Sequence, residues 1–215
     1  MRGLVGKPSG LEIASSPVGA PAFVFFDAIP PCAMLPHTFP EAGMFRRVED
    51  FKSIWQQEAE KTLAVFAAIP DAAAHQAVDA HHRDLRCLAW HLVENILELP
   101  QNLGLKVKGP VALGSDGFIG APPPTMAEIG ATYLAVSESL LDHIGSWSNT
   151  ELGRNFTLYG ETWTGAFALY VLVSHQTHHR GQMTVLMRQA GLAVPSVYGP
   201  TREGWADFGL EPPKV

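Results

Sequence analysis

The sequence predicts an all-α protein, a four-helix bundle of antiparallel helices that follows an irregular N-terminal extension. Four segments repeat apolar residues at spacings of three and four, the pattern of helices buried on one side. No segment shows a convincing strand pattern, and prolines and glycines gather between the four segments. Amphipathic helices that have no sheet to cover bury their apolar faces against one another, so a bundle is expected.

Composition places the chain among globular proteins and excludes several classes. Of its 215 residues, 47% are hydrophobic and 17% are charged. The net charge of −6 and the lack of a Lys/Arg cluster argue against nucleic-acid binding. No apolar run reaches the ~18 residues of a membrane span. Two cysteines, Cys32 and Cys87, form no disulfide framework, so we expect a reducing, cytoplasmic location.

Residues 1–43 differ from the rest of the chain. They hold seven of the seventeen prolines and show no helical period. The stretch ahead of a cleavage-like A-P-A is too polar for the apolar centre of a signal peptide. The sequence therefore predicts an irregular extension at 1–43 and a helical domain with a C-terminal coil at 44–215. Met44, which precedes the first predicted helix, is an alternative translation start.

The first two helices are predicted at residues 48–69 and from Asp84 to the neighbourhood of Pro100. Pro70 ends the first helix, and Asp84 is a typical N-cap for the second. The polar connection between them carries His75, His81 and His82, which we expect in solvent. His91 instead falls within the mostly apolar second helix, with Cys87 one turn before it and Glu94 one turn after it.

A Gly/Pro-rich connection at 103–124 precedes the third helix. Thr125 and Glu128 form a capping box, and the helix is predicted to run to about Trp147. Residues 148–161 are predicted to be a loop or a short extended piece.

The fourth helix is predicted from Thr162, as N-cap, to Ala190, with Gly191 in the left-handed conformation after it. Its sequence contains V-L-V-S-H-Q-T-H-H-R-G-Q, in which His175 and His179 stand four apart on one face. Gln182 shares this face and can hydrogen-bond a histidine there, whereas His178 points about 80–100° away.

His91, His175 and His179 are the predicted metal ligands. Neutral imidazole is a common metal ligand, and bundles build metal sites between facing helices. Three histidines fill only part of a tetrahedral or octahedral shell, which leaves a position for water or substrate. Zn²⁺ or Ni²⁺ suits such ligands, and nitrogen atoms alone do not select between them. The alternative is that these are ordinary histidines of a buried helix; Cys87 is either a further ligand or a small buried apolar residue.

The segments L-A-W-H-L-V-E and H-Q-T-H-H-R-G-Q-M-T-V-L-M-R-Q-A-G-L-A-V-P-S-V-Y-G-P closely resemble the DinB-like (DinB/YfiT) superfamily. The resemblance covers about residues 44–200 and implies a four-helix bundle with a crossover topology, often a homodimer, that holds a divalent metal. Its three metal histidines fall on His91, His175 and His179. Residues 1–43 have no counterpart in the family pattern, and Cys87 stands where a polar residue is more usual.

Several members of this superfamily are thiol S-transferases or thiol-dependent isomerases. The leading hypothesis is therefore a metal-dependent enzyme that uses a low-molecular-weight thiol on a small-molecule substrate, without nucleic-acid or membrane partners. Glu94 and Gln182 would orient imidazoles or move protons. Tyr198 and Arg188 either shape the pocket or pack on the surface. A metal-dependent hydrolase and a non-catalytic metal- or ligand-binding stress protein, its shell closed by a group such as Cys87, are the alternatives.

Overall fold

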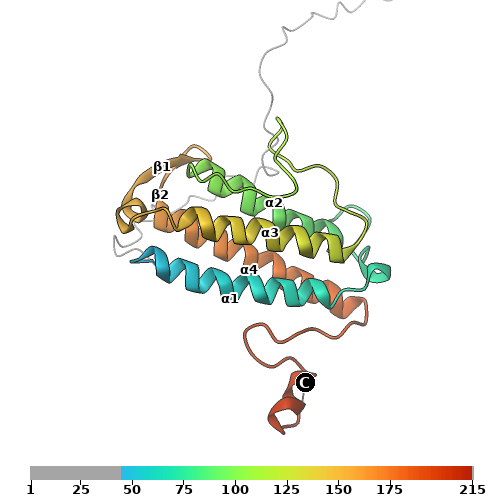
Figure 1. Cartoon of the computed structure of the whole chain (residues 1–215). Helices are drawn as coiled ribbons and strands as arrows, with labels where there is room; N and C mark the ends of the chain where they lie inside the picture. Colours follow the sequence, from blue (N-terminus) through green and yellow to red (C-terminus); the bar gives the residue numbers. More distant parts are fainter. Residues whose placement is uncertain (1–44, 215) are drawn as a thin grey trace, which may run out of the picture. The chain divides into compact units, whose positions relative to one another are not determined.

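The computed structural model describes residues 45–214, so the predicted extension at 1–43 lies outside the described residues. In this part of the chain four α-helices and one two-stranded sheet are present, with three short 3₁₀ turns (Figure 1). The predicted all-α bundle is confirmed. The helices are α1 (Val48–Ala67), α2 (Leu85–Asn102), α3 (Met126–Ile144) and α4 (Gly165–Gln189). The other elements are η1 (Asp71–Ala73), η2 (Asn149–Gly153), β1 (Asn155–Leu158), β2 (Glu161–Thr164) and η3 (Gly204–Phe208).

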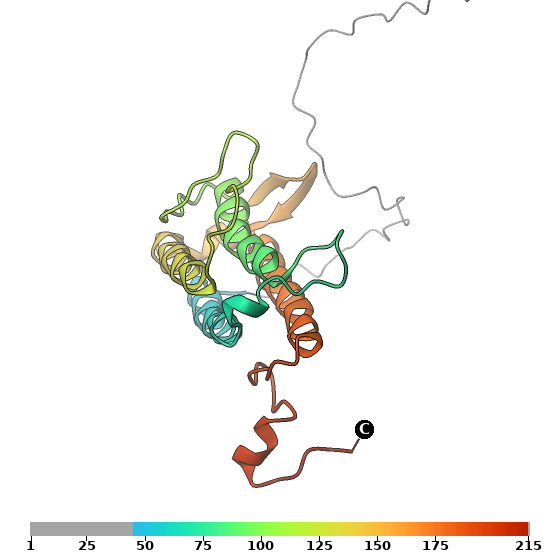
Figure 2. The ribbon, with the colours of Figure 1, turned by 90° about the vertical axis from the view of Figure 1, so that its right-hand side faces the viewer.

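The order of the helices around the bundle differs from their order in the chain. Helix α1 packs against α3 and α4, and α2 packs against the same two helices. In the end-on view the consecutive helices α1 and α2 therefore lie diagonally across the bundle, as do α3 and α4 (Figure 2). This is a crossover arrangement, and its consequence is that the histidine of α2 lies beside the histidines of α4.

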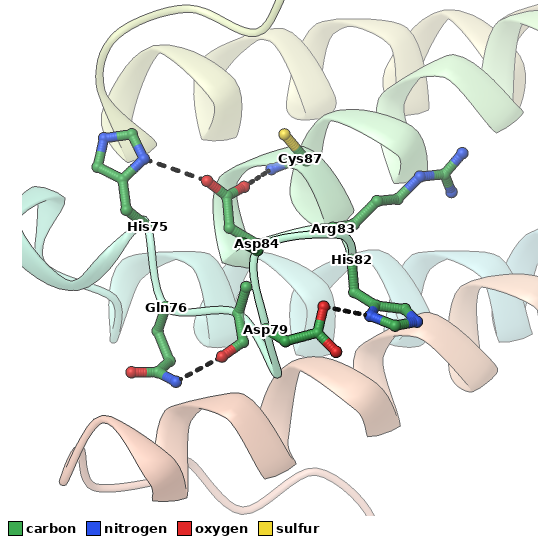
Figure 3. A pocket seen from close by; sticks show the side chains of 9 residues that line it. His75, Gln76, Asp79, His82, Arg83, Asp84 and Cys87 are labelled. Atoms are coloured by element: carbon green, nitrogen blue, oxygen red, sulfur yellow. Dashed lines mark hydrogen bonds and ion pairs between the residues drawn. The ribbon is translucent and has the colours of Figure 1, made fainter.

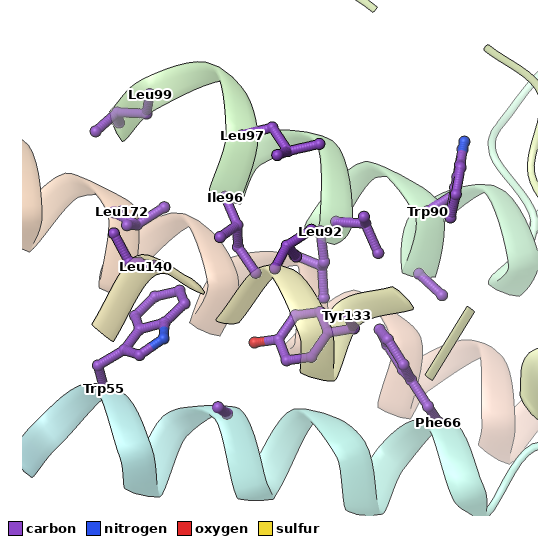
Figure 4. Packing of buried hydrophobic residues seen from close by; sticks show 14 of the residues in the cluster. Trp55, Phe66, Trp90, Leu92, Ile96, Leu97, Leu99, Tyr133, Leu140 and Leu172 are labelled. Carbon is purple, nitrogen blue, oxygen red and sulfur yellow. The ribbon is translucent and has the colours of Figure 1, made fainter. Parts of the chain in front are cut away.

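The core fills the space between the four helices. Trp55 and Phe66 of α1 point inward, and the ring of Phe66 packs edge-on against Tyr133 of α3 at 5.4 Å between ring centroids (Figure 4). Leu92 of α2 and Leu172 of α4 are fully buried at the same centre. No helix among the described residues is long and apolar enough to cross a membrane.

Local capping residues begin two helices where the sequence predicts. The Asp84 carboxylate accepts a hydrogen bond from the Cys87 amide at 2.7 Å, and Thr125 and Glu128 form the expected capping box of α3. Gly191 follows α4 at a φ of +72°, in the predicted left-handed region.

The start of α4 and the segment before it differ from the prediction. Residues 155–164 form an antiparallel hairpin, a strand pairing that the sequence pattern does not indicate. Its strands have four residues each and are mostly exposed, so they lack the apolar alternation that identifies a half-buried strand. Thr162 pairs with Thr157 in this hairpin, and Thr164 is the actual N-cap of α4.

Candidate metal centre

His91 of α2 and His175 and His179 of α4 come together at one point of the bundle. Each offers a ring nitrogen, and the three nitrogens lie within 4.8 Å of one another. The Nε2 atoms of His91 and His175 are 3.0 Å apart. Within residues 45–214 these three form the group of His, Cys, Asp and Glu side chains that are close enough to hold a metal ion together. We call them the histidine trio.

Hydrogen bonds on the far side of two rings set their tautomers. The Nδ1 atom of His91 lies 3.1 Å from Glu94 Oε1, and the Nδ1 atom of His179 lies 2.7 Å from Gln182 Oε1. A carboxylate oxygen and an amide oxygen only accept, so each Nδ1 carries the proton and donates it. The Nε2 atoms of His91 and His179 therefore carry lone pairs, the form of nitrogen that binds a cation; that of His91 faces His175 Nε2 at 3.0 Å.

Burial keeps the two histidines of α4 neutral. Desolvation, followed by the neighbouring His179 and His91, lowers the pKa of His175 to about 3. Desolvation also lowers the pKa of His179 to about 4, against the hydrogen bond that its Nδ1–H donates to Gln182, which raises the pKa. Neutral imidazole is the ligand form, so no proton has to leave these rings at pH 7 before they bind a metal.

The donor set fits a divalent ion of the zinc or nickel class. Nitrogens that bind one such ion at about 2.0–2.1 Å from neighbouring positions lie about 3.0–3.4 Å apart. The separation of 3.0 Å between the Nε2 atoms of His91 and His175 is at the lower end of that range, and all three ligand nitrogens lie within 4.8 Å of one another. In addition, the Nδ1–H donors of His91 and His179 already have oxygen acceptors, as metal-bound histidines generally do.

Glu94 contacts more than its histidine. Its Oε1 accepts from His91, and its Oε2 accepts from the backbone amide of Ile119 at 3.3 Å. Residue 119 belongs to the Gly/Pro-rich connection before α3, so one carboxylate bonds both the ring of His91 and that connection. The side chains of His91 and Glu94 are 19% and 14% exposed, which leaves this pair partly accessible.

A second acidic side chain of α2, which the sequence does not single out, also makes a long-range contact. Glu98 lies one turn beyond Glu94, and both of its carboxylate oxygens accept from the Tyr159 hydroxyl at 2.8 Å. Burial raises the pKa of Glu98, and the charge of Glu94 adds to that effect. The i, i+4 spacing of the two glutamates is visible in the sequence. Tyr159, the partner of Glu98, lies at the tip of the β1–β2 hairpin, which the sequence pattern does not predict.

Residues 44–214 match the sequence model of the DinB family. The chain belongs to the DinB family. It is 35% identical over 174 residues to the uncharacterized protein YrdA of Bacillus subtilis, and the matched region covers 80% of this chain and 100% of YrdA.

Solved structures agree with this membership. A DinB-like protein from Bacillus cereus superposes with a TM-score of 0.65 at 33% sequence identity, covering 72% of this chain and 100% of its own. The DinB-like protein YjoA from Bacillus subtilis superposes with a TM-score of 0.55 at 16% identity, covering 71% and 99% of the two chains, and at that identity it supports the fold alone.

Cys87 and the histidines of the α1–α2 connection lie outside the trio of this DinB-family chain. Of these residues, His75, His82 and Cys87 line an open depression of about 520 Å³ at the start of α2 (Figure 3). In it His75 pairs with Asp84 at 3.1 Å and His82 pairs with Asp79 at 2.6 Å. Burial, together with the nearby Asp84, raises the pKa of the Cys87 thiol, which keeps it protonated and a poor ligand.

The C-terminal residues Tyr198 and Arg188 have structural partners instead. The Tyr198 hydroxyl bonds to Glu58 and Arg180, a buried ion pair between α1 and α4. Arg188 pairs with Glu203 on the surface. Neither contact involves the histidine trio, so the surface-packing interpretation accounts for both residues.

Proposed function

We propose that this protein is a divalent-metal-dependent enzyme that transfers a small thiol, as an S-transferase or a thiol-dependent isomerase. Its substrates would be a low-molecular-weight thiol and a small electrophile. The observation that carries the proposal is the histidine trio, which brings three imidazoles together without a carboxylate or thiolate among the described residues in the same group. Such a ligand set leaves coordination positions open, as catalytic metal sites do.

The residues have separate roles in this proposal. His91, His175 and His179 would hold the ion, which when bound supplies Lewis acidity that lowers the pKa of a thiol. Glu94 holds the His91 proton at Nδ1 and so keeps the Nε2 lone pair directed to the centre. Gln182 does the same for His179. Both are positioning residues, since their contacts are with the imidazoles.

The position of Cys87 supports an open site over a closed one. A non-catalytic site would use a further protein group to complete the shell, and Cys87 was the sequence candidate. Cys87 does not belong to the group of side chains whose ligand atoms lie close enough together to hold one metal ion, and the pKa of its thiol is raised. The proposal includes a homodimer in a reducing, cytoplasmic compartment, as the resemblance and the two-cysteine sequence imply.

Metal analysis of three proteins tests the site. Wild type, His175→Ala and His178→Ala are purified, and their metal content is measured by inductively coupled plasma mass spectrometry. His178 is the matched control, because it lies on the same helix but is exposed and outside the trio. We expect about one equivalent of divalent metal in wild type and His178→Ala and a large loss in His175→Ala.

Turnover assays then test the reaction. Metal-loaded wild type is given small electrophiles together with a panel of low-molecular-weight thiols, and substrate loss is followed with and without thiol. Thiol-dependent turnover that is lost in His175→Ala supports the proposal. Ester or amide turnover without thiol would replace it with a hydrolase, and the absence of metal in every sample, with none taken up on addition, would refute it.

A further inference from the structure

A fully buried amide ties three helices together beside the histidine trio. Gln176 of α4 is 0% exposed. Its Nε2 donates to the backbone carbonyl of Leu92 on α2 at 3.0 Å, and its Oε1 accepts from the Tyr133 hydroxyl of α3 at 3.1 Å. Tyr133 is also 0% exposed, so these bonds lie within the apolar core.

The hydrogen bond between Gln176 and the Leu92 carbonyl joins two residues that each directly follow a member of the trio. Leu92 directly follows His91, and Gln176 directly follows His175. The bond therefore joins α2 and α4 at the level where the Nε2 atoms of His91 and His175 approach to 3.0 Å. A slip of one residue along a helix moves a side chain by about 1.5 Å and turns it by about 100°. Either displacement would separate the imidazole nitrogens.

A buried amide makes such a slip unfavourable. Apolar contacts are not directional, so they fix the register of two helices less strictly than a hydrogen bond does. An amide that loses its partners in an apolar environment instead remains unsolvated and unpaired. The Gln176 side chain has one donor bond to α2 and one acceptor bond to α3, and both would break if α4 moved.

We propose that Gln176 is a positioning residue for the metal centre. Together with Tyr133 it fixes the register of α4 on α2, so that His91 meets His175 and His179 in one place before any ion binds. The inference rests on the proposed function in that it requires the trio to bind a metal. It adds a residue that contacts neither the ligand nitrogens nor the opening between them.

Gln176→Leu is the main test, with Tyr133→Phe as a milder variant that removes only the hydroxyl. Ser137→Ala is the matched control. The Ser137 hydroxyl accepts from Trp55 Nε1 at 2.8 Å, a buried bond between α1 and α3 that does not involve α2 or α4. Each full-length variant is titrated with Zn²⁺ against a chelator and with Co²⁺, whose visible absorption reports the ligand geometry, and its stability is measured by urea unfolding.

We expect Gln176→Leu to weaken Zn²⁺ binding by at least about tenfold and to change the Co²⁺ spectrum, because preorganisation of the ligands is lost. Tyr133→Phe should weaken it by about two- to fivefold, and Ser137→Ala should bind within about twofold of wild type even where its stability falls as much. If Gln176→Leu does not fold, Gln176→Met and Tyr133→Phe are read in the same way.

The outcomes separate this inference from the proposed function. Wild type that binds metal, with equal affinity and spectrum in the Gln176 and Tyr133 variants, overturns the inference alone. A parallel loss of affinity in Ser137→Ala overturns it too, because general destabilisation would then explain the effect. Wild type that binds no metal overturns both.

Discussion

Replacing Glu94 with glutamine removes one acceptor that the structure uses. The carboxylate serves two donors, the Nδ1–H of His91 at 3.1 Å and the backbone N–H of Ile119 at 3.3 Å. A carboxamide has one oxygen and one NH₂ group, and NH₂ cannot accept. In Glu94→Gln one of the two donors therefore faces another donor, whichever way the amide turns.

The expected loss follows from this conflict. An unsatisfied donor in a partly buried place costs about 1–3 kcal/mol. If the cost falls on His91, its ring loses both its charge-assisted bond and its defined tautomer, and metal affinity drops by about 10- to 100-fold, or about 1.4–2.8 kcal/mol. If it falls on Ile119, the connection before α3 loosens and affinity changes less. We expect the first result, because the ring of His91 turns more easily than the backbone.

Competition of Zn²⁺ with a chelator measures the affinity, and Glu98→Gln is the control. Glu98 lies one turn away on the same helix, and the substitution removes the same formal charge. Both Glu98 oxygens accept from the Tyr159 hydroxyl, and Oε1 also accepts from Asn102 Nδ2 at 3.3 Å, so a single carboxamide oxygen at the Oε1 position can replace them. Equal losses in the two variants would mean that charge matters and the bond to His91 does not. Wild-type affinity in Glu94→Gln would refute the reasoning altogether.

Two further predictions concern pH and the buried ion pair. The folded pKa values of about 3 for His175 and about 4 for His179 lie below the ordinary 6.5 of the unfolded chain. As the pH falls below about 6.5, the unfolded chain binds protons first, so the stability of the metal-free protein decreases between about pH 6.5 and pH 4. Urea unfolding at pH 7 and pH 5 should differ by about 1–3 kcal/mol, and a smaller difference in His175→Ala is expected; an equal difference would contradict the assignment. Arg180→Met removes one of the two cations that contact the buried Glu58, which keeps Lys61 at 2.7 Å, and should lose about 1.5–3 kcal/mol in the same assay. Removal of the exposed Arg47–Asp50 pair should cost under about 1 kcal/mol.

Much of the helical architecture can be predicted from local sequence. Helix periodicity and capping depend on residues within one or two turns, so α1, the Asp84 cap and the Thr125–Glu128 box are readable without a structure. The start of α4 is less certain, because Thr162 and Thr164 are equally good caps and only the pairing of Thr162 with Thr157 excludes the first. That pairing depends on an exposed hairpin of eight strand residues with little apolar signal.

The same division applies to the candidate site. The i, i+4 spacing of His175 and His179 and the position of His91 in an apolar helix are properties of the sequence, because helix geometry converts spacing directly into a shared face. The family resemblance places the same three residues together. The contacts that surround them, from Ile119 to Glu94 and from Tyr159 to Glu98, join segments that are 25 and 61 residues apart in the chain. No local pattern encodes such contacts.

By itself, the sequence determined the four helices, most of their ends and the three histidines. The family resemblance implied a crossover topology with the three histidines in one place, and the structure shows α2 beside α4 and diagonal to α1. Tertiary structure alone decided that Cys87 stays outside the trio and that the amide of Gln176 joins the helices next to His91 and His175. The physical reason is that helix formation depends on neighbours along the chain, whereas the order and register of packed helices depend on which side chains fill a shared core. A buried polar group such as Gln176 shows its role only when its partners on other helices are known.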